Sequence, residues 1–369
     1  MEKSIGKIGI REYVAIIILL VAVKNADGTT ALLVEHSGSA YWILPLIILV
    51  ISVIPLYLMM KVITLYKDKN LHDCNVHLFG KYIGSLISFV LFIFGICTLI
   101  TDSAAYVDII GTMYFSQTPT IILSVVLMAG SAYIAQKGLE NIGTVAWSVL
   151  FYLIGALSFS LILALQDGNV SFLHPIFGPG IWDVVKDGTF HMSIYTEFFF
   201  LGLIAPYIVS SKSYTKGTVI GLMVVTILLC FSYLTYLLVF DYKGLQTVSY
   251  PYHELIRVVR FGFLTNLESF IFPFWIIVTF IRFSFYLYLM ALLLGAIFQI
   301  KNFEYLTPTL AAIVVIFGTA IEAPSFTTFF IRENVLGNIG IIFLALPCLM
   351  WLVAKIKGEF KHDQATNNR

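Results

Sequence analysis

The residues most able to do chemistry in this sequence are ionisable side chains set inside long apolar runs. Lys24 and Asp27 lie where the first run is interrupted, Glu197 lies in the sixth run, and Arg282 bisects the eighth. A charge in such a place is costly to bury, so it marks an ion pair, a proton path or a ligand site. These residue types therefore predict the binding of an ion or a small polar molecule.

Motifs for bond-breaking chemistry are missing from the sequence. It contains no Walker-type phosphate loop, no HExxH and no Gly-x-Ser-x-Gly nucleophile elbow. The four cysteines are scattered without metal-ligand or disulfide spacing. We therefore expect no catalytic residue, no metal site and no cofactor.

Composition places the chain in a lipid bilayer. Of its 369 residues 59% are hydrophobic and 12% are charged, and the mean hydropathy is +0.92. Soluble domains carry about 25% charged residues, which they need to cover their surface. The net charge of +1 also gives no reason to expect nucleic-acid binding.

Apolar runs long enough to cross a hydrocarbon core of ~30 Å recur along the whole chain. Lipid leaves no water for free backbone groups, and the runs exceed barrel-strand length, so they must be helices. We predict an all-α polytopic membrane protein of about ten transmembrane helices, forming a single transmembrane domain over residues 1–369. The runs are 12–36, 42–66, 81–113, 117–135, 140–166, 189–210, 216–240, 266–300, 305–323 and 335–356.

The positions of Lys and Arg set the expected orientation. If the runs alternate in direction, most of the 22 Lys and Arg residues fall on the side of the N-terminus. Cytoplasmic loops carry that excess, so both termini are expected inside, with 357–369 as a cytoplasmic tail. The first run has no small-residue cleavage site and is interpreted as a membrane helix rather than a signal peptide.

The first run contains a polar interruption after Val14–Val23. That apolar piece is too short to span a bilayer alone, which favours a broken helix whose free backbone groups line a binding cavity. The alternative is that helix 1 ends near Val23 and an outer loop follows. The interrupting residues are Lys24, Asn25, Ala26, Asp27, Gly28, Thr29 and Thr30.

The sixth run has a similar interruption near Gly202 and Pro206. Proline removes a backbone donor and clashes with the preceding turn, so the helix either breaks or merely kinks there. Breaks in runs 1 and 6 suit a five-plus-five inverted repeat with a midplane site. The first repeat would cover about 10–166 and the second about 189–356.

Further ionisable residues lie within the apolar runs, and each needs a partner or a polar surrounding. Glu268 and Arg282 are 14 residues apart in one run, roughly 20 Å along a helix, and cannot touch. Arg282 should face the bundle interior, with Glu197 or Asp27 as its partner, and Lys24 could also pair with Asp27. Asp102 lies either at the outer interface or, on the same face as Tyr106, in the cavity.

Two long outer segments, 167–188 and 241–265, contain Pro, Gly and charges. In the second, YPYHELIRVVRFG alternates apolar and charged residues at helical spacing, which favours a short helix on the outer surface over a solvated connector.

The sequence resembles the spore germination permeases, the B subunits of nutrient germinant receptors in the amino acid–polyamine–organocation transporter superfamily. The resemblance rests on the run layout and on a Tyr-Pro, Leu-Ile-Arg and Leu-Glu-Ser pattern with a downstream Trp275. His174-Pro175, Glu197 and Pro206 are similar to the family's approach to helix 6 and its acidic and Pro positions. The pattern residues are Tyr250, Pro251, Tyr252, His253, Glu254, Leu255, Ile256 and Arg257, then Phe263, Leu264, Thr265, Asn266, Leu267, Glu268 and Ser269.

The resemblance implies a receptor that senses a small nutrient, most often an amino acid, between helices 1 and 6. Helices 3 and 8 would supply walls, which adds Tyr106 and Ser269 to the ligand-contact candidates at 25–30, Glu197, Phe199, Phe200 and Gly202. It also implies an A subunit and a C-subunit lipoprotein as partners in the inner membrane of a dormant spore. Lys24, Asp102, Glu268 and Arg282 are candidates for ion pairing or coupling.

Two departures from the family's pattern matter. Asn266 stands where relatives often carry Arg, and the helix 1 break is charged rather than Gly-rich and apolar. A charged break suits a different nutrient or a coupled ion. Two further functions stay open: an ion-coupled secondary transporter of amino acids, because fold does not decide function, and a pore for monovalent cations.

Overall fold

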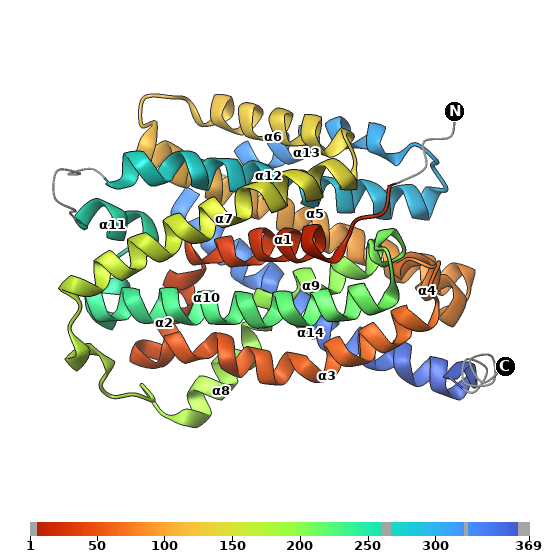
Figure 1. Cartoon of the computed structure of the whole chain (residues 1–369), viewed down its shortest axis with the longest axis horizontal. Helices are drawn as coiled ribbons and strands as arrows, with labels where there is room; N and C mark the ends of the chain where they lie inside the picture. Colours follow the sequence, from red (N-terminus) through yellow and green to blue (C-terminus); the bar gives the residue numbers. More distant parts are fainter. Residues whose placement is uncertain (1–5, 260–266, 321–323, 361–369) are drawn as a thin grey trace.

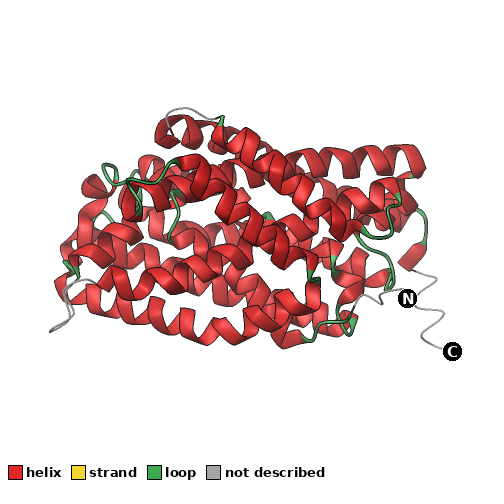
Figure 2. Cartoon of the chain, turned by 90° about the horizontal axis from the view of Figure 1, so that it is seen from above, coloured by secondary structure: helices red, strands yellow, loops and turns green. Residues whose placement is uncertain are grey.

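The computed structural model describes residues 6–259, 267–320 and 324–360. Within these ranges the chain is helical, and its one β-type pairing is an isolated bridge between Ile8 and Ile208. Most helices run along a common axis, and the chain's first and last helices begin and end, respectively, at the same end of the molecule (Figures 1 and 2). This arrangement is the one expected of a helical membrane bundle.

The α-helices follow the predicted runs closely, with short helices added at the connections. They are α1 (Ile10–Val21), α2 (Thr29–Ser37), α3 (Leu44–Leu65), α4 (Leu71–Phe79), α5 (Lys81–Ile109), α6 (Thr120–Gln136), α7 (Leu139–Ala164), α8 (Ile181–Phe190), α9 (Glu197–Phe200), α10 (Ser211–Leu245), α11 (Pro251–Val258), α12 (Leu267–Phe298), α13 (Thr307–Thr319) and α14 (Pro324–Ile356).

Within the described ranges, six helical segments are long and apolar enough to cross a membrane. Large apolar side chains on them are exposed, among them Val50 at 71% and Ile227 at 64%, as a lipid-facing surface requires. The chain is therefore a multi-pass membrane protein. The count of about ten spans, and the orientation with both termini inside, stay predictions that the shorter apolar helices Thr120–Gln136, Met192–Leu203 and Phe303–Thr319 would help to complete.

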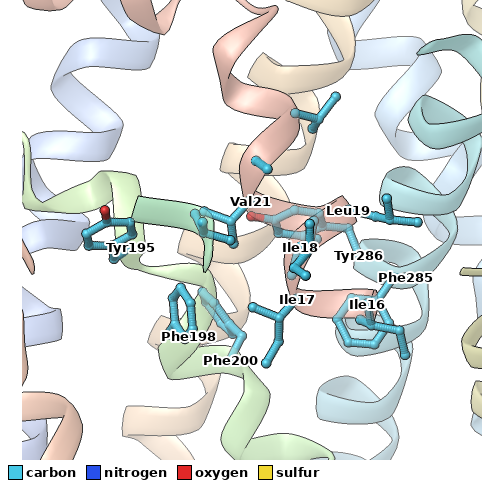
Figure 3. Packing of buried hydrophobic residues seen from close by; sticks show 14 of the residues in the cluster. Ile16, Ile17, Ile18, Leu19, Val21, Tyr195, Phe198, Phe200, Phe285 and Tyr286 are labelled. Carbon is cyan, nitrogen blue, oxygen red and sulfur yellow. The ribbon is translucent and has the colours of Figure 1, made fainter. Parts of the chain in front are cut away.

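Helix α12 lies at the centre of the bundle. The apolar part of this helix is 83% buried, whereas the other five long segments are 39–50% buried. Figure 3 shows Phe285 and Tyr286 of α12 on one side of α1, with Tyr195, Phe198 and Phe200 on the other. A polar side chain in the middle of α12 must therefore find its partners inside the protein.

The interruption predicted in the first run is present. Helix α1 ends at Val21, a 3-10 turn covers Ala22–Asn25, and α2 begins at Thr29. Asn, Asp and Gly are poor helix formers, and Asp side chains compete for nearby backbone donors. Accordingly, Asp27 Oδ1 accepts a hydrogen bond from the Thr29 N–H at 2.8 Å, which starts α2.

The sixth run is interrupted earlier than predicted. Helix α8 ends at Phe190, the chain leaves helical geometry at His191, and helical turns resume at Met192. Gly202 and Pro206 lie in later 3-10 turns, where Gly202 faces Ile63 and Leu71. Helix α8 carries charged residues within IWDVVKDGTF, which is why the sequence favoured an outer connector over 167–188.

The second outer segment contains the short helix expected on the outer surface. Helix α11 lies at the opposite end of the molecule from the termini (Figure 1), and it buries Tyr252, His253, Leu255 and Ile256. The resemblance residues 263–266 and the tail residues 361–369 lie outside the described ranges.

Candidate functional site

Four charged side chains from four helical segments meet in the interior beside the two interruptions. Lys24 comes from the first interruption, Asp102 from α5, Glu197 from the start of α9, and Arg282 from α12. They are only 4%, 2%, 2% and 1% exposed, respectively. We call these four residues the central ion cluster.

Lys24 connects the two interrupted helices. Its ammonium lies 2.6 Å from Glu197 Oε1 and 2.7 Å from Oε2. It also donates to the backbone carbonyls of Ile194 at 2.8 Å and Ser193 at 3.4 Å. Those carbonyls belong to the short helical turn that follows the break at His191, where carbonyl groups can accept from side chains. The Ser193 carbonyl also accepts from the hydroxyl of Thr196 at 2.6 Å.

Glu197 is an acceptor for α12 as well as for Lys24. Tyr286 donates to its Oε1 at 2.9 Å, and Arg282 Nη2 lies 3.5 Å from the same oxygen. A carboxylate buried this deeply is stable only when several donors compensate for the lost water. Lys24, Arg282 and Tyr286 together meet that need.

Arg282 confirms the expectation that it faces the bundle interior. Its Nη2 lies 2.7 Å from Asp102 Oδ2, and its Nη1 donates to the carbonyl of Leu20, near the end of α1. The guanidinium also lies over the rings of Tyr286 and Tyr106, 5.3 and 5.8 Å from their centroids. A planar cation with several donors suits this combination of acceptors and aromatic faces.

The central ion cluster balances its own charge. Two cations, Lys24 and Arg282, face two carboxylates, Asp102 and Glu197. Unpaired charge at this depth is strongly unfavourable, whereas a paired and hydrogen-bonded set is tolerated. The cluster therefore joins the two broken helices to α5 and α12 through interactions that depend on every member.

A small cavity opens onto the cluster. Its volume is about 20 Å³, room for about one water molecule. Groups from both interruptions and from α5 surround it. The lining residues are Lys24, Thr29, Leu32, Thr98, Asp102, Phe190, His191, Ser193, Ile194, Glu197 and Gly337.

The other residues proposed at the first interruption are held by neighbouring helices. Asn25 Nδ2 donates to Ser232 at 3.2 Å, and Tyr236 donates to the Asn25 carbonyl at 3.0 Å, both from α10. Ala26, Gly28 and Thr30 are buried, and Thr29 lies at the cavity. The first interruption is thus fixed against α10 as well as against the central ion cluster.

The remaining candidates divide into near and distant groups. Tyr106 is fully buried, stacks on Trp275 with centroids 5.6 Å apart, and faces Arg282. Phe199 and Phe200 are buried in the apolar core. Ser269 is exposed near the start of α12, and Glu268 pairs there with Arg257 at 2.7 Å, away from the central ion cluster.

Sequence reasoning missed Tyr286, His191 and the two acceptor carbonyls. Tyr286 lies one helical turn after Arg282, so the spacing could have predicted that both side chains share one face of α12. His191 Nδ1 lies 2.8 Å from Asp187, whose carboxylate also accepts a hydrogen bond from Ser37 of α2. Backbone carbonyls leave no trace in residue types, so only the structure reveals them.

Comparison with known proteins identifies the family of this chain. A family model described as spore germination protein matches residues 10–327. Spore germination protein YndE of Bacillus subtilis (strain 168) is 22% identical over 85% of this chain and 86% of its own. Spore germination protein KB of the same organism is 24% identical over 82% and 81%, and GerQB of Bacillus cereus is 22% identical over 77% and 78%.

Solved transporter structures share the fold. MHP1, a nucleobase-cation-symport-1 family transporter in a closed conformation, superposes with a TM-score of 0.57 at 14% identity, covering 93% of this chain and 78% of its own. A manganese transporter of Eremococcus coleocola gives 0.57 at 14% identity, covering 92% and 77%. At such identities the likeness shows the fold alone. The match over 10–327 decides the family, and this chain belongs to the spore germination proteins.

Proposed function

We propose that this chain is the membrane-embedded, nutrient-sensing subunit of a germinant receptor. It would act in the inner membrane of a dormant spore with an A subunit and a C-subunit lipoprotein. Family membership supports the role in germination. The observation that supports sensing is the Lys24–Glu197 ion pair, which joins two interrupted helices beside a cavity.

The site is suited to detecting a ligand because it is closed. A cavity of about 20 Å³ holds about one water molecule, whereas small-molecule pockets usually measure about 300–1,000 Å³. A nutrient can enter only if the surrounding helices separate. Because Lys24 spans the gap between the two interruptions, its ion pair favours the closed arrangement, and binding energy would be spent in shifting that equilibrium.

Germination of spores that lack this gene tests the proposal. Loss of the response to one nutrient class, with normal uptake of labelled nutrients by vegetative cells, is the expected result. In spores carrying Glu197→Gln, the nutrient dose–response should shift while the protein still accumulates. Unchanged germination of the deletion strain with every nutrient would refute the proposal.

The second candidate function is ion-coupled secondary transport of amino acids. It is favoured by the shared fold of the transporters and by buried carboxylates that could carry a coupling proton. Normal germination of the deletion strain with reduced, saturable uptake would favour transport over sensing.

A further inference from the structure

The first helix interruption bears on the chemical class of the nutrient, an inference that rests on the proposed function. An α-amino acid carries an ammonium and a carboxylate. A broken-helix site receives the ammonium on unwound carbonyls and acidic side chains, and the carboxylate on the N-terminus of the following half-helix. Acceptors for an ammonium and a helix N-terminus for a carboxylate are both present at this interruption. The class of ligand they can bind depends on whether side chains of the protein already occupy them.

The acceptors suited to an ammonium are taken by Lys24. Its Nζ contacts both oxygens of Glu197, at 2.6 and 2.7 Å, and the carbonyl oxygen of Ile194 at 2.8 Å. This is the arrangement of a carboxylate and unwound carbonyls that a free amine would need. Lys24 is only 4% exposed. A free amine would therefore have to displace the Lys24 ammonium, which is held at the site by its own backbone.

The N-terminus of α2, the position suited to a carboxylate, is already faced by Asp27. Its Oδ1 accepts from the Thr29 N–H at 2.8 Å at the start of α2, and Asp27 is fully buried. The carboxylate therefore lies where the α2 dipole and free N–H groups favour a negative charge. An incoming carboxylate would meet Asp27 as a like charge.

The charge of the nearby arginine is already balanced by carboxylates, and its Nε, which has no hydrogen-bond partner among the described residues, leaves one donor for a neutral oxygen. Arg282 donates to Leu20 and to Asp102, and it lies 3.5 Å from Glu197. A zwitterion adds no net charge to the balanced central ion cluster, but each of its two charged groups would lose its water here and find the partners of opposite sign already paired. An uncharged molecule avoids that cost.

The cavity lining suits an uncharged, hydrogen-bonding molecule. Beside the members of the central ion cluster, the lining includes three residues that carry hydroxyl groups, Thr29, Thr98 and Ser193, together with apolar Leu32 and Ile194. The Thr98 hydroxyl donates to the carbonyl of Phe94 at 2.9 Å, which leaves its oxygen able to accept from a ligand. Such a lining matches a molecule with hydroxyl groups and an apolar face.

We propose that Lys24 and Asp27 act as a built-in ammonium and a built-in carboxylate, so that this chain senses an uncharged, hydroxyl-bearing nutrient and not an amino acid. The sequence resemblance implied an amino acid, because it reports what the family most often senses. The contacts of the two side chains argue for the other class.

Germination of wild-type, deletion and complemented spores separates the two classes. The probes are D-glucose, D-fructose and inosine as uncharged molecules, and L-alanine and L-valine as zwitterions. We expect a gene-dependent response to at least one uncharged probe and none to the zwitterions. A gene-dependent response to a zwitterion at lower concentration than to any uncharged probe overturns the inference but leaves the proposed function intact. No gene-dependent response to any probe counts against both.

A variant tests the built-in ammonium directly. In purified full-length chain, Lys24→Ala opens the amine position beside Glu197, so methylammonium should raise the thermal unfolding midpoint of this variant but not that of the wild type. Lys301→Met, at an exposed lysine, is the matched control and should behave as the wild type does. Equal stabilisation of wild type and Lys24→Ala overturns the inference. If Lys24→Ala does not fold, the germination panel tests the inference without any variant.

Discussion

Among the residues that the structure describes, an arginine lies between carboxylates in two places, and the two places differ in burial rather than in contact distance. Arg282 lies 2.7 Å from Asp102 in the central ion cluster, where their side chains are 0% and 3% exposed. Arg257 of α11 lies 2.7 Å from Glu268 of α12, where the side chains are 35% and 28% exposed. Glu254 adds a looser contact to Arg257 at 3.8 Å, and we call Glu254, Arg257 and Glu268 the outer ion cluster.

Contact distance alone therefore says little about what an ion pair does. Exposed pairs contribute about 0–1 kcal/mol because water and salt replace the lost partner. Removing one member of a buried pair lowers the free energy of unfolding by about 3–5 kcal/mol, because the remaining charge is left without a partner and without water. The central ion cluster is therefore expected to control which arrangement the helices adopt, and the outer ion cluster only to position α11 on α12.

Arg282→Met should show the largest effect. It leaves Asp102 and Glu197 facing Lys24 alone, and we expect a loss of about 3–5 kcal/mol in the free energy of unfolding, measured by the unfolding of purified protein in detergent micelles. Arg282→Met with Asp102→Asn restores the charge balance and should recover part of the loss. A loss below about 1 kcal/mol in the single variant would mean that the central ion cluster contributes no more to stability than an exposed ion pair does.

Lys24 and Glu197 should be strongly coupled. Lys24→Met leaves Glu197 with Arg282 and Tyr286, and Glu197→Gln leaves Lys24 with neutral acceptors. In the double variant neither charge remains, so its destabilisation should be smaller than the sum of the two, by about 0.5–3 kcal/mol. The measurement is a double-mutant cycle on unfolding in detergent. Additive effects would show that the contact at 2.6 Å does not join the two interruptions energetically.

The sequence predicted the members of the central ion cluster better than their pairing. Lys24, Glu197 and Arg282 stand out because ionisable residues within apolar runs are rare and costly. Which of them touch depends on how the helices are rotated and on where each helix is interrupted. The pattern of apolar residues predicts neither the rotation nor the position of the interruption. Glu197 was one of two named partners for Arg282, and Asp102 was named for an interface or a cavity without a partner.

The interruptions show the same division. The first was predictable because Asn25, Asp27 and Gly28 put poor helix formers in the middle of an apolar run. The second was placed at Gly202 and Pro206 because proline is the strongest helix-breaking signal. The break at His191 follows a helix that carries Asp183, Lys186 and Asp187, and local residue types make such a helix look like a loop.

His253 of α11 makes the stability of the region around the outer ion cluster depend on pH. Burial lowers the pKa of this histidine from 6.5 to about 3; the nearby Arg257 adds to that effect and the backbone of Ala26 opposes it. The ring accepts or donates a hydrogen bond with Tyr114 at 2.7 Å and lies 4.7 Å from the ring of Trp275. Helix α11 is thus anchored by a neutral, buried side chain as well as by the outer ion cluster.

The unfolded chain binds a proton at His253 below pH 6.5, and the folded chain does so only near pH 3. This contribution to stability is therefore complete above pH 6.5 and is lost as the pH falls, by up to about 1.4 kcal/mol per pH unit. His253→Gln should flatten the fall of the unfolding midpoint between pH 7 and pH 5, whereas His36→Gln, at an exposed histidine, should not. Identical slopes in wild type and His253→Gln would mean that His253 is charged in the folded protein.

Glu268→Gln should have the smallest effect. The change removes the charge that faces Arg257 but keeps the hydrogen bond from Arg257 Nη2 to the Met113 carbonyl at 2.6 Å. Because both side chains reach solvent, we expect a loss of about 0.2–1 kcal/mol at low salt. The loss should shrink further at high salt, where exposed charges are screened. Germination by the variant should match the wild type, since Glu268 lies away from the central ion cluster. A shifted nutrient dose–response would instead make the outer ion cluster part of the sensing mechanism, and burial would no longer separate the two regions.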